Sequence, residues 1–242
     1  MAANVNILRR PNDRGLMVVA AAAFPLLVLA GYFKSYYFRP FFENPPFANS
    51  LVHIHAVVMS VWVLYFVAQV VLIRTKNIKL HITLGSAGIV LAAVVVVVGM
   101  VTAWDSHIVR GTAPSGMNPH GFFIVPTLDM LFFVIFFGGA IYFRKRPAEH
   151  KTLMLMTAIN FSPAAIARLP LFPPELFIIQ ALAMPAALGL ACFAWHTWKH
   201  RKFNWVFAIA LFAFIASGPL RVVIAGTQMW LDFIGWLATY AN

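Results

Sequence analysis

Histidine side chains open four consecutive apolar stretches of this sequence. His55 lies near the start of the stretch that begins at residue 51, and His81, His120 and His150 stand at the starts of the next three. Neutral imidazole is the commonest metal ligand in proteins, and haem iron takes axial ligands on both sides of its plane. Facing helices of a bundle can supply such ligands. The pattern therefore predicts bis-imidazole sites for haem b.

The direction of the stretches sorts these histidines into two pairs. Successive spanning helices run in opposite directions, so their starts alternate between the two sides of a membrane. His55 and His120 are then expected on the outer side, and His81 and His150 on the inner side. Two haem b groups at two depths would make a route for electrons across the membrane. His53 points away from His55, because two residues advance a helix by about 200°, and the deeper His55 is the predicted ligand.

Small and polarizable residues follow two of the histidines at helical spacing. Gly85 and Gly88 come after His81 and predict a groove beside it, and Met154 lies four residues after His150. Methionine thioethers pack well against flat groups. Each feature also has an ordinary interpretation, since a histidine at a helix–water boundary can serve as a polar cap and methionines at helical spacing commonly pack in a core.

The polar loop expected between the third and fourth apolar stretches offers another kind of site. Asp105, His107 and His120 belong to it, and His53 and His55 are expected on the same outer side. Together they can supply nitrogen and oxygen ligands for a zinc or copper ion. The loop also has the glycines and prolines of ordinary turns, and its spacing matches no tight metal-binding motif.

Ionisable side chains inside the apolar stretches are a third feature. Burying them in lipid is expensive, so Asp129 is expected to pair with either Arg168 or Arg221. Such a pair could join helices, or its arginine could anchor haem propionates or an anionic substrate. Arg168 is the predicted cofactor-binding arginine. Gln69 and Asn160 are further polar residues within apolar stretches.

Seven apolar stretches must position all these residues. A bilayer-crossing helix needs about 20 mostly apolar residues. The stretches are Leu16–Phe33, Leu51–Ile73, Ile82–Trp104, Phe122–Phe143, Thr152–Leu169, Leu176–Trp195 and Phe203–Leu220. The first is interpreted as a retained helix, because its apolar run is longer than that of a signal peptide.

The composition agrees with a membrane protein. Hydrophobic residues make up 62% and charged residues 10% of the 242 residues, and the mean hydropathy is +0.82. That is too few charges to cover a soluble domain and too much hydrophobicity for a disordered chain. The prediction is one all-α membrane domain over residues 1–242, a bundle of seven transmembrane helices with a four-helix cofactor core over 51–169.

The net charge of +11 reports the orientation of this bundle. A basic protein often binds nucleic acid. Here the expected partner is the lipid bilayer, and no binding to nucleic acid is expected. Most of the lysines and arginines fall in the N-terminal tail, with Arg9, Arg10 and Arg14, and in the turns at 74–81, 144–151 and 195–202. Cytoplasmic loops carry an excess of such residues, so the N-terminus is predicted to be cytoplasmic.

The C-terminal part, 203–242, is expected to hold the last span and an amphipathic tail. Gln228 and Asp232 lie on one polar stripe of a helix, while Trp236 and Tyr240 are residues that favour the membrane boundary. An amphipathic helix on the outer surface is therefore predicted. An eighth span over Val222–Asn242 is the alternative.

Short motifs resemble the transmembrane cytochromes of the b561 group. HAVVM at 55–59 resembles the HPxxM-type opening of their second helix, and LHITLG at 80–85 resembles the LHSWLG-type opening of their third. His120 falls where their third ligand lies. The resemblance covers roughly residues 50–165 and implies two haem b groups and electron transfer from ascorbate or a quinol. It departs at His150, which lies between Glu149 and Lys151 rather than inside an apolar helix.

Two further segments resemble a large group of bacterial predicted membrane proteins of unassigned function. RTKNIKLHITLG and RKRPAEHKTLMLM look like the segments of this group that often read R-x-x-x-x-H-x-x-L-G and R-R-x-x-H-R-x-x-M at the same places. This resemblance implies a bacterial inner-membrane location and no particular activity.

The leading functional hypothesis is an inner-membrane haem b protein for transmembrane electron transfer, with a quinol or another small donor. A zinc or copper membrane protein with an outer-face site is one alternative. A non-catalytic helical subunit of a respiratory or photosynthetic complex is another. The sequence has no phosphate loop, dinucleotide fingerprint or nucleophile elbow, so an oxidoreductase activity would depend on the histidines. The single cysteine, Cys192, can form no disulfide within the chain.

Overall fold

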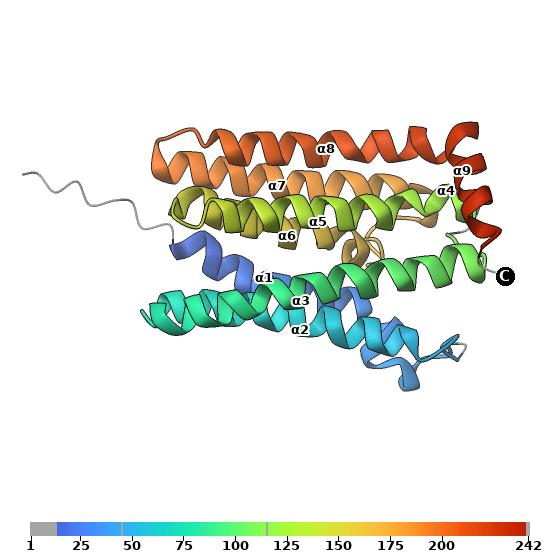
Figure 1. Cartoon of the computed structure of the whole chain (residues 1–242), viewed down its shortest axis with the longest axis horizontal. Coiled ribbons are helices and arrows are strands. Elements are labelled where there is room, and N and C mark those ends of the chain that lie inside the picture. The colour runs from blue at the N-terminus through green and yellow to red at the C-terminus, as the bar shows by residue number, and fades with distance from the viewer. Residues whose placement is uncertain (1–13, 45, 115, 241–242) are drawn as a thin grey trace, which may run out of the picture.

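The computed structural model describes residues 14–44, 46–114 and 116–240, and these form helices joined by short loops (Figure 1). The long helices are α1 (Arg14–Tyr32), α2 (Leu51–Arg74), α3 (Ile78–Trp104), α5 (Ile124–Tyr142), α6 (Pro147–Ile166), α7 (Phe177–His200) and α8 (Trp205–Ala225). The short ones are η1 (Phe33–Tyr37), η2 (Arg39–Phe41), η3 (Asp105–Val109), α4 (Pro119–Phe122), η4 (Pro174–Leu176) and α9 (Gln228–Ala238). The described residues contain no strand, as predicted.

Six helical segments of the described chain are long and apolar enough to cross a membrane. They are Gly15–Tyr37, Leu51–Arg74, Ile78–Val109, Pro119–Tyr142, Phe177–His200 and Trp205–Ala225. These candidate segments agree with the multi-pass character expected from the composition. Each of these segments is longer than the stretch predicted for it, and two of them gain short helical turns, because η3 continues α3 and α4 leads into α5. Asp105, His107 and His120, which were expected in a loop, are accordingly in helical turns.

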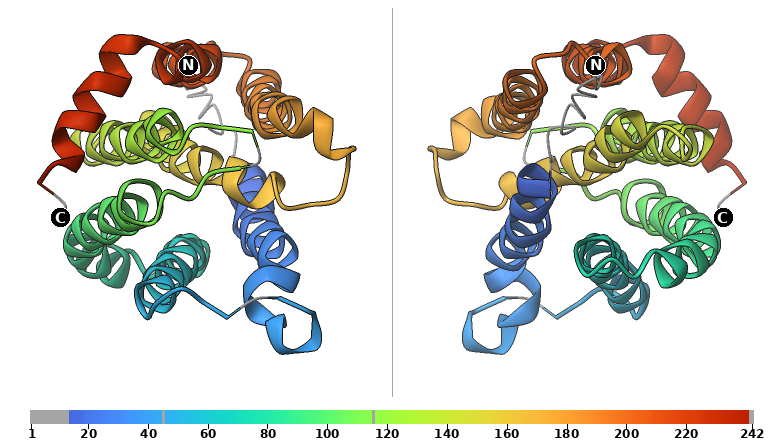
Figure 2. Two further views of the ribbon diagram at one scale, coloured as in Figure 1. Left: turned by 90° about the vertical axis from the view of Figure 1, so that its right-hand side faces the viewer. Right: turned by 90° about the vertical axis from the view of Figure 1, so that its left-hand side faces the viewer.

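The remaining long helix, α6, lies in the middle of the bundle. It packs against α1, α5, α7 and α8, and the end-on views of Figure 2 show these helices around it. It buries more of its residues than any other described helix, including the polar Thr157, Asn160 and Ser162. A helix enclosed by other helices can carry polar residues that a lipid-facing helix cannot. This placement explains why α6 is less apolar than the six spanning segments.

Aromatic side chains fill the space between the helices. Trp62 and Phe66 of α2 pack with Phe133 and Phe137 of α5 and with Phe161 of α6. The ring centroids of Trp62 and Phe133 are 4.8 Å apart in an edge-to-face arrangement, a geometry that aromatic pairs prefer. This cluster joins the two sides of the bundle.

Glycines allow two close approaches between helices. A Cβ at Gly31 of α1 would collide with the backbone of Ala165 in α6. A Cβ at Gly88 of α3 would collide with the hydroxyl of Tyr65 in α2. The groove predicted beside His81 is thus filled at Gly88, whereas Gly85 has open space at its Cβ position.

The basic turns lie together at one end of the molecule, which is named the basic end. The α2–α3, α5–α6 and α7–α8 turns are all at the left of Figure 1. They carry Arg74, Lys76, Lys79, Arg144, Lys145, Arg146, Lys199, Arg201 and Lys202. Arg9 and Arg10, which belong to the same predicted charge pattern, lie outside the described residues.

Helix α9 lies across the opposite end, which is named the α9 end (Figures 1 and 2). Ile234 of α9 is buried against Ala103, Ile108 and Phe123. With 11 residues at about 1.5 Å per residue, α9 is far shorter than the hydrocarbon core of about 30 Å. It is therefore too short to be the eighth span that the sequence left open.

Candidate functional site

His81 and His150 lie next to each other at the basic end. His81 is on the first turn of α3 and His150 is on the first turn of α6. Their ring centroids are 6.4 Å apart and the ring planes are nearly perpendicular, at 85°. Of the two predicted histidine pairs, this is the one that the structure brings together.

Helix starts hold both imidazoles in place. The side chain of Asn77 accepts a hydrogen bond from the backbone N–H of Leu80 and caps α3, as asparagine favours at this position. Pro147 stands in the first turn of α6, where its missing N–H removes no helical bond. Each histidine thus follows a signal that fixes where its helix begins.

The neighbouring helices contact the Nδ1 atoms of both rings. His150 Nδ1 lies 2.8 Å from the carbonyl oxygen of Ala140 in α5, so this nitrogen carries the proton and Nε2 keeps a lone pair. His81 Nδ1 lies 2.5 Å from the side-chain amide of Gln69 in α2. Such contacts to the second nitrogen commonly orient histidines that bind metal.

Gln69 decides which nitrogen of His81 carries the proton. The orientation that best satisfies the amide turns its nitrogen to His81 Nδ1, while its oxygen accepts from the Tyr65 hydroxyl at 2.9 Å and from Gly85 N at 3.1 Å. The ring proton is then on Nε2. A metal at Nε2 requires the opposite orientation, in which the amide oxygen accepts the Nδ1 proton. The sequence marked Gln69 only as a polar residue in an apolar stretch.

The ring spacing of this site suits a metal held between two imidazoles, whereas the satisfied orientation of Gln69 leaves the His81 proton on Nε2. Histidine nitrogens bind metals at about 2.0–2.1 Å, so two rings whose Nε2 atoms faced one ion from opposite sides would have centres about 6.3 Å apart. The observed 6.4 Å agrees with this value. The space beside His81 is at Gly85, one turn further along α3, because Tyr65 occupies the position at Gly88.

No ring contact joins the other predicted haem pair, His55 and His120, within the described residues. His55 is on α2, which packs against α1 and α3, whereas His120 is on α4, which packs against α5, α8 and α9. Within the described residues, His55 Nδ1 is buried without a hydrogen-bond partner. The carbonyl of His120 accepts a bond from the Trp230 indole at 3.0 Å.

Arg168, the predicted cofactor-binding arginine, lies on the same side as His55. Its charge acts on the His55 imidazole, and its guanidinium lies over the Tyr32 ring, 4.5 Å from the centroid. It also donates to the carbonyl of Ala164 at 2.5 Å. The arginine thus joins the ends of α1 and α6 beside His55.

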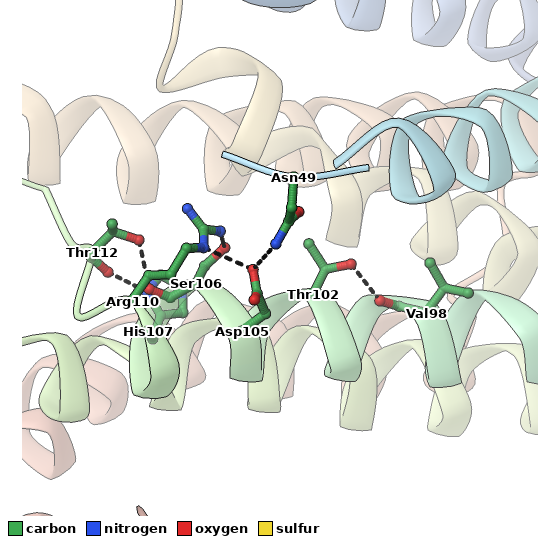
Figure 3. Close-up of polar contacts among 8 residues, drawn as sticks. All are labelled: Asn49, Val98, Thr102, Asp105, Ser106, His107, Arg110 and Thr112. Carbon is green, nitrogen blue, oxygen red and sulfur yellow. Dashed lines mark hydrogen bonds and ion pairs between the residues drawn. The ribbon is translucent and has the colours of Figure 1, made fainter. Parts of the chain in front are cut away.

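Asp105, predicted as a metal ligand, bonds to the side chains of Arg110 and Asn49 (Figure 3). Its Oδ2 atom accepts from Arg110 Nε at 2.8 Å and from Asn49 Nδ2 at 3.0 Å. The Nη2 atom of Arg110 donates to Ser106 Oγ at 2.7 Å. The carboxylate therefore holds the end of η3 to the segment before α2.

The histidines of the predicted outer metal site have separate partners. His107 Nδ1 lies 2.6 Å from the carbonyl of Thr112. His53 Nδ1 lies 3.3 Å from the Tyr36 hydroxyl, and its ring packs against Phe47 at 4.6 Å. In the described part of the chain, no three His, Cys, Asp or Glu side chains gather as a metal would need.

Asp129 pairs with Arg221, one of the two partners that the sequence allowed. Asp129 Oδ1 of α5 lies 2.5 Å from Arg221 Nη1 of α8. Asn160 of α6 donates to the backbone carbonyl of Asp129 at 2.8 Å. Breaking a buried pair by removing one partner costs roughly 3–5 kcal/mol, so the three helices depend on both partners of this contact being present.

The chain was compared with models of known protein families, with curated proteins and with solved structures. None of them matches it.

Proposed function

We propose that this protein is an integral membrane electron-transfer protein that holds a b-type haem between His81 and His150. The observation that carries the proposal is the spacing of the two imidazoles, 6.4 Å between ring centroids, which suits axial ligands on opposite sides of one iron. A haem bound there would supply a one-electron redox centre. A quinol or another small donor is the proposed source of electrons.

The chain itself orients the two ligands. The Ala140 carbonyl keeps the His150 proton on Nδ1, and the Gln69 amide oxygen would do the same for His81. Met154 lies one turn beyond His150, packed against the aromatic cluster that contains Trp62. The proposal covers one haem, because the ring contact between His81 and His150 has no counterpart between His55 and His120 among the described residues. A second haem at that pair stays a prediction.

The proposed membrane arrangement has seven spans and a cytoplasmic N-terminus. The six apolar segments and α6 supply the spans, and α9 lies on the outer surface. The support is the collection of basic turns at one end of the bundle (Figure 1), which under the positive-inside rule is the cytoplasmic end. The proposed location is a bacterial inner membrane, and its support is the resemblance of RTKNIKLHITLG and RKRPAEHKTLMLM to bacterial membrane proteins.

A visible spectrum tests the haem proposal. The full chain would be expressed with haem supplied, purified in a mild detergent, and measured reduced minus oxidised. We expect cytochrome b bands and about one haem per chain. His81→Ala and His150→Ala should each remove the bands, whereas His200→Ala, a change in another histidine at the basic end, should keep them.

Two outcomes would overturn the proposal: a wild-type protein without cytochrome b bands, or bands that persist in both ligand variants. The zinc or copper alternative draws less support, because Asp105 and His107 already bond to Arg110 and Thr112. Elemental analysis of the same sample checks it directly. Purification of a stable larger complex would favour the accessory-subunit alternative.

A further inference from the structure

The guanidinium of Arg221 has a bonded side and an unbonded side. The residue is only 6% exposed, and Nη1 donates to Asp129. Among the described residues, Nε and Nη2 are buried and have no hydrogen-bond partner. These two nitrogens form one edge of the guanidinium, with parallel N–H bonds that match the two oxygens of a carboxyl group.

Another arginine of the same chain shows how this edge is normally filled. Arg110 uses its Nε to bond Asp105 and its Nη2 to bond Ser106, at 2.8 and 2.7 Å (Figure 3). Arg221 is far more buried than Arg110, yet the equivalent edge of its guanidinium has no hydrogen-bond partner among the described residues. A buried charged donor without an acceptor is destabilising, so an acceptor group from outside the described chain would stabilise this site.

Asn160 adds an unused acceptor to the same cluster. It is fully buried, its Nδ2 donates to the Asp129 carbonyl, and its Oδ1 has no partner among the described residues. Asp129, Asn160 and Arg221 are thus joined by hydrogen bonds and leave two donors and one acceptor unused. A protonated carboxyl group has the complementary set, with oxygens that accept and one O–H that donates.

We propose that Arg221 and Asn160 bind the carboxyl group of an apolar organic acid within the bundle. Asp129 and Arg221 have opposite charges, so the site favours the neutral acid over a second anion. The Asp129 side chain is 17% exposed, against 7% for Arg221, so the cluster reaches the protein surface at Asp129. The spanning segments around it are apolar, which suits a ligand with a hydrocarbon chain. This site is separate from the His81–His150 pair at the basic end.

Thermal unfolding of the purified full chain in dodecyl maltoside, at about pH 4.5 so that a large share of a carboxylic acid is protonated, tests the site. The probes are octanoic acid, methyl octanoate and octanol at equal concentration, with acetic acid as a soluble acid. Near saturation, we expect octanoic acid to raise the unfolding midpoint by about 2–4 °C. The ester and the alcohol should raise it by less than half as much. If acetic acid raises the midpoint as much as octanoic acid does, the site takes small soluble acids. If acetic acid has no effect, the site takes lipid-like acids.

Variants assign the effect to the arginine edge. Arg221→Lys keeps the charge but lacks the paired N–H bonds, and it should lose the octanoic acid shift. Arg110→Lys makes the same change at a filled edge and should keep the shift. Asn160→Leu, which removes the unused acceptor, serves if Arg221→Lys does not fold, and it should reduce the shift at least twofold. Equal shifts with acid, ester and alcohol in the wild-type protein would refute the proposal, as would a full shift in Arg221→Lys.

Discussion

Gln69 is the side chain on which the chemistry of His81 depends. Its amide can present either an oxygen or a nitrogen to His81 Nδ1 at 2.5 Å, and only the oxygen leaves the Nε2 lone pair free for a metal. The amide is also tied to Tyr65, whose hydroxyl lies 3.3 Å from the carbonyl of Leu84. A single buried amide thus couples α2 to the tautomer of a histidine on α3.

Gln69→Leu should weaken haem binding about 10–100-fold, as loss of contacts that orient metal ligands commonly does. Gln69→Glu, which offers only acceptor oxygens to Nδ1, should retain it. Titration of the purified protein with haem measures both. Gln180→Leu removes another buried amide, one that bonds to the carbonyls of Ile166 and Leu169, and serves as the control. Equal haem affinity in the Gln69→Leu and wild-type proteins would show that Gln69 does not orient His81.

The Asp129–Arg221 pair makes a prediction of its own. Asp129→Leu should lower the free energy of unfolding by about 3–5 kcal/mol, because it leaves a buried arginine without its partner. Asp129→Leu combined with Arg221→Met should recover at least half of that loss. Denaturant unfolding in detergent micelles, analysed as a double-mutant cycle, measures the coupling. A double variant that loses the sum of the two single losses would contradict a direct interaction.

At the scale of elements, α6 is the helix that contributes to both polar clusters. It contributes His150 at the basic end and Asn160 to the Asp129–Arg221 cluster, and it packs against four other long helices. Its closest approach to α1 is at Gly31, where the two backbones meet without an intervening side chain. The polarity of α6 is tolerated because its neighbours, rather than lipid, surround it.

Gly31→Ala should therefore destabilise the bundle by about 1–3 kcal/mol, since a Cβ there must push α1 away from α6. Gly138→Ala introduces the same methyl group where nothing lies within 4 Å, and its effect should stay within about 0.5 kcal/mol. Thermal unfolding of both variants in the same detergent makes the comparison. Equal midpoints for the two would mean that α1 and α6 do not approach as described.

At the scale of the whole molecule, charge and shape are aligned along one axis. Basic turns occupy one end, and α9 crosses the other (Figure 1). The face of α9 that points away from the bundle exposes Met229, Phe233 and Trp236, and Tyr240 just after the helix is exposed too. These residues suit the region between headgroups and acyl chains. A helix with that face lies in a membrane surface more stably than in water.

Reporter fusions test this arrangement. Alkaline phosphatase is active only outside the cytoplasm, so fusions after Lys76, Lys145 and Lys202 should be inactive, and fusions after Pro114 and Leu171 should be active. Green fluorescent protein at the same sites should give the reverse pattern. The pair at Lys145 and Leu171 brackets α6 and decides whether this helix spans. Equal activities at these two sites would reduce the span count to six.

Sequence alone was sufficient for the class of the protein and for most of its helices. Composition indicates a membrane environment, because a chain with 62% hydrophobic residues has too few polar residues to form a water-exposed surface. The length of each apolar stretch indicates where the spanning segments lie. Helix ends were less predictable. Local hydrogen bonds extend α3 through η3 and begin α4 at Pro119, so Asp105 and His120 are in helical turns that hydropathy alone does not mark.

Only the tertiary structure decided which side chains meet. Four helix-opening histidines could pair in several ways, and His81 meets His150 because α3 and α6 both begin at the basic end, where their first turns lie close together. Asp129 could have paired with Arg168 or Arg221, and it meets Arg221 because α8 packs beside α5 while Arg168 lies beside His55. The position of a residue along its own helix determines which helix face it is on and how deep it lies in the membrane. Packing between helices determines which side chain it meets.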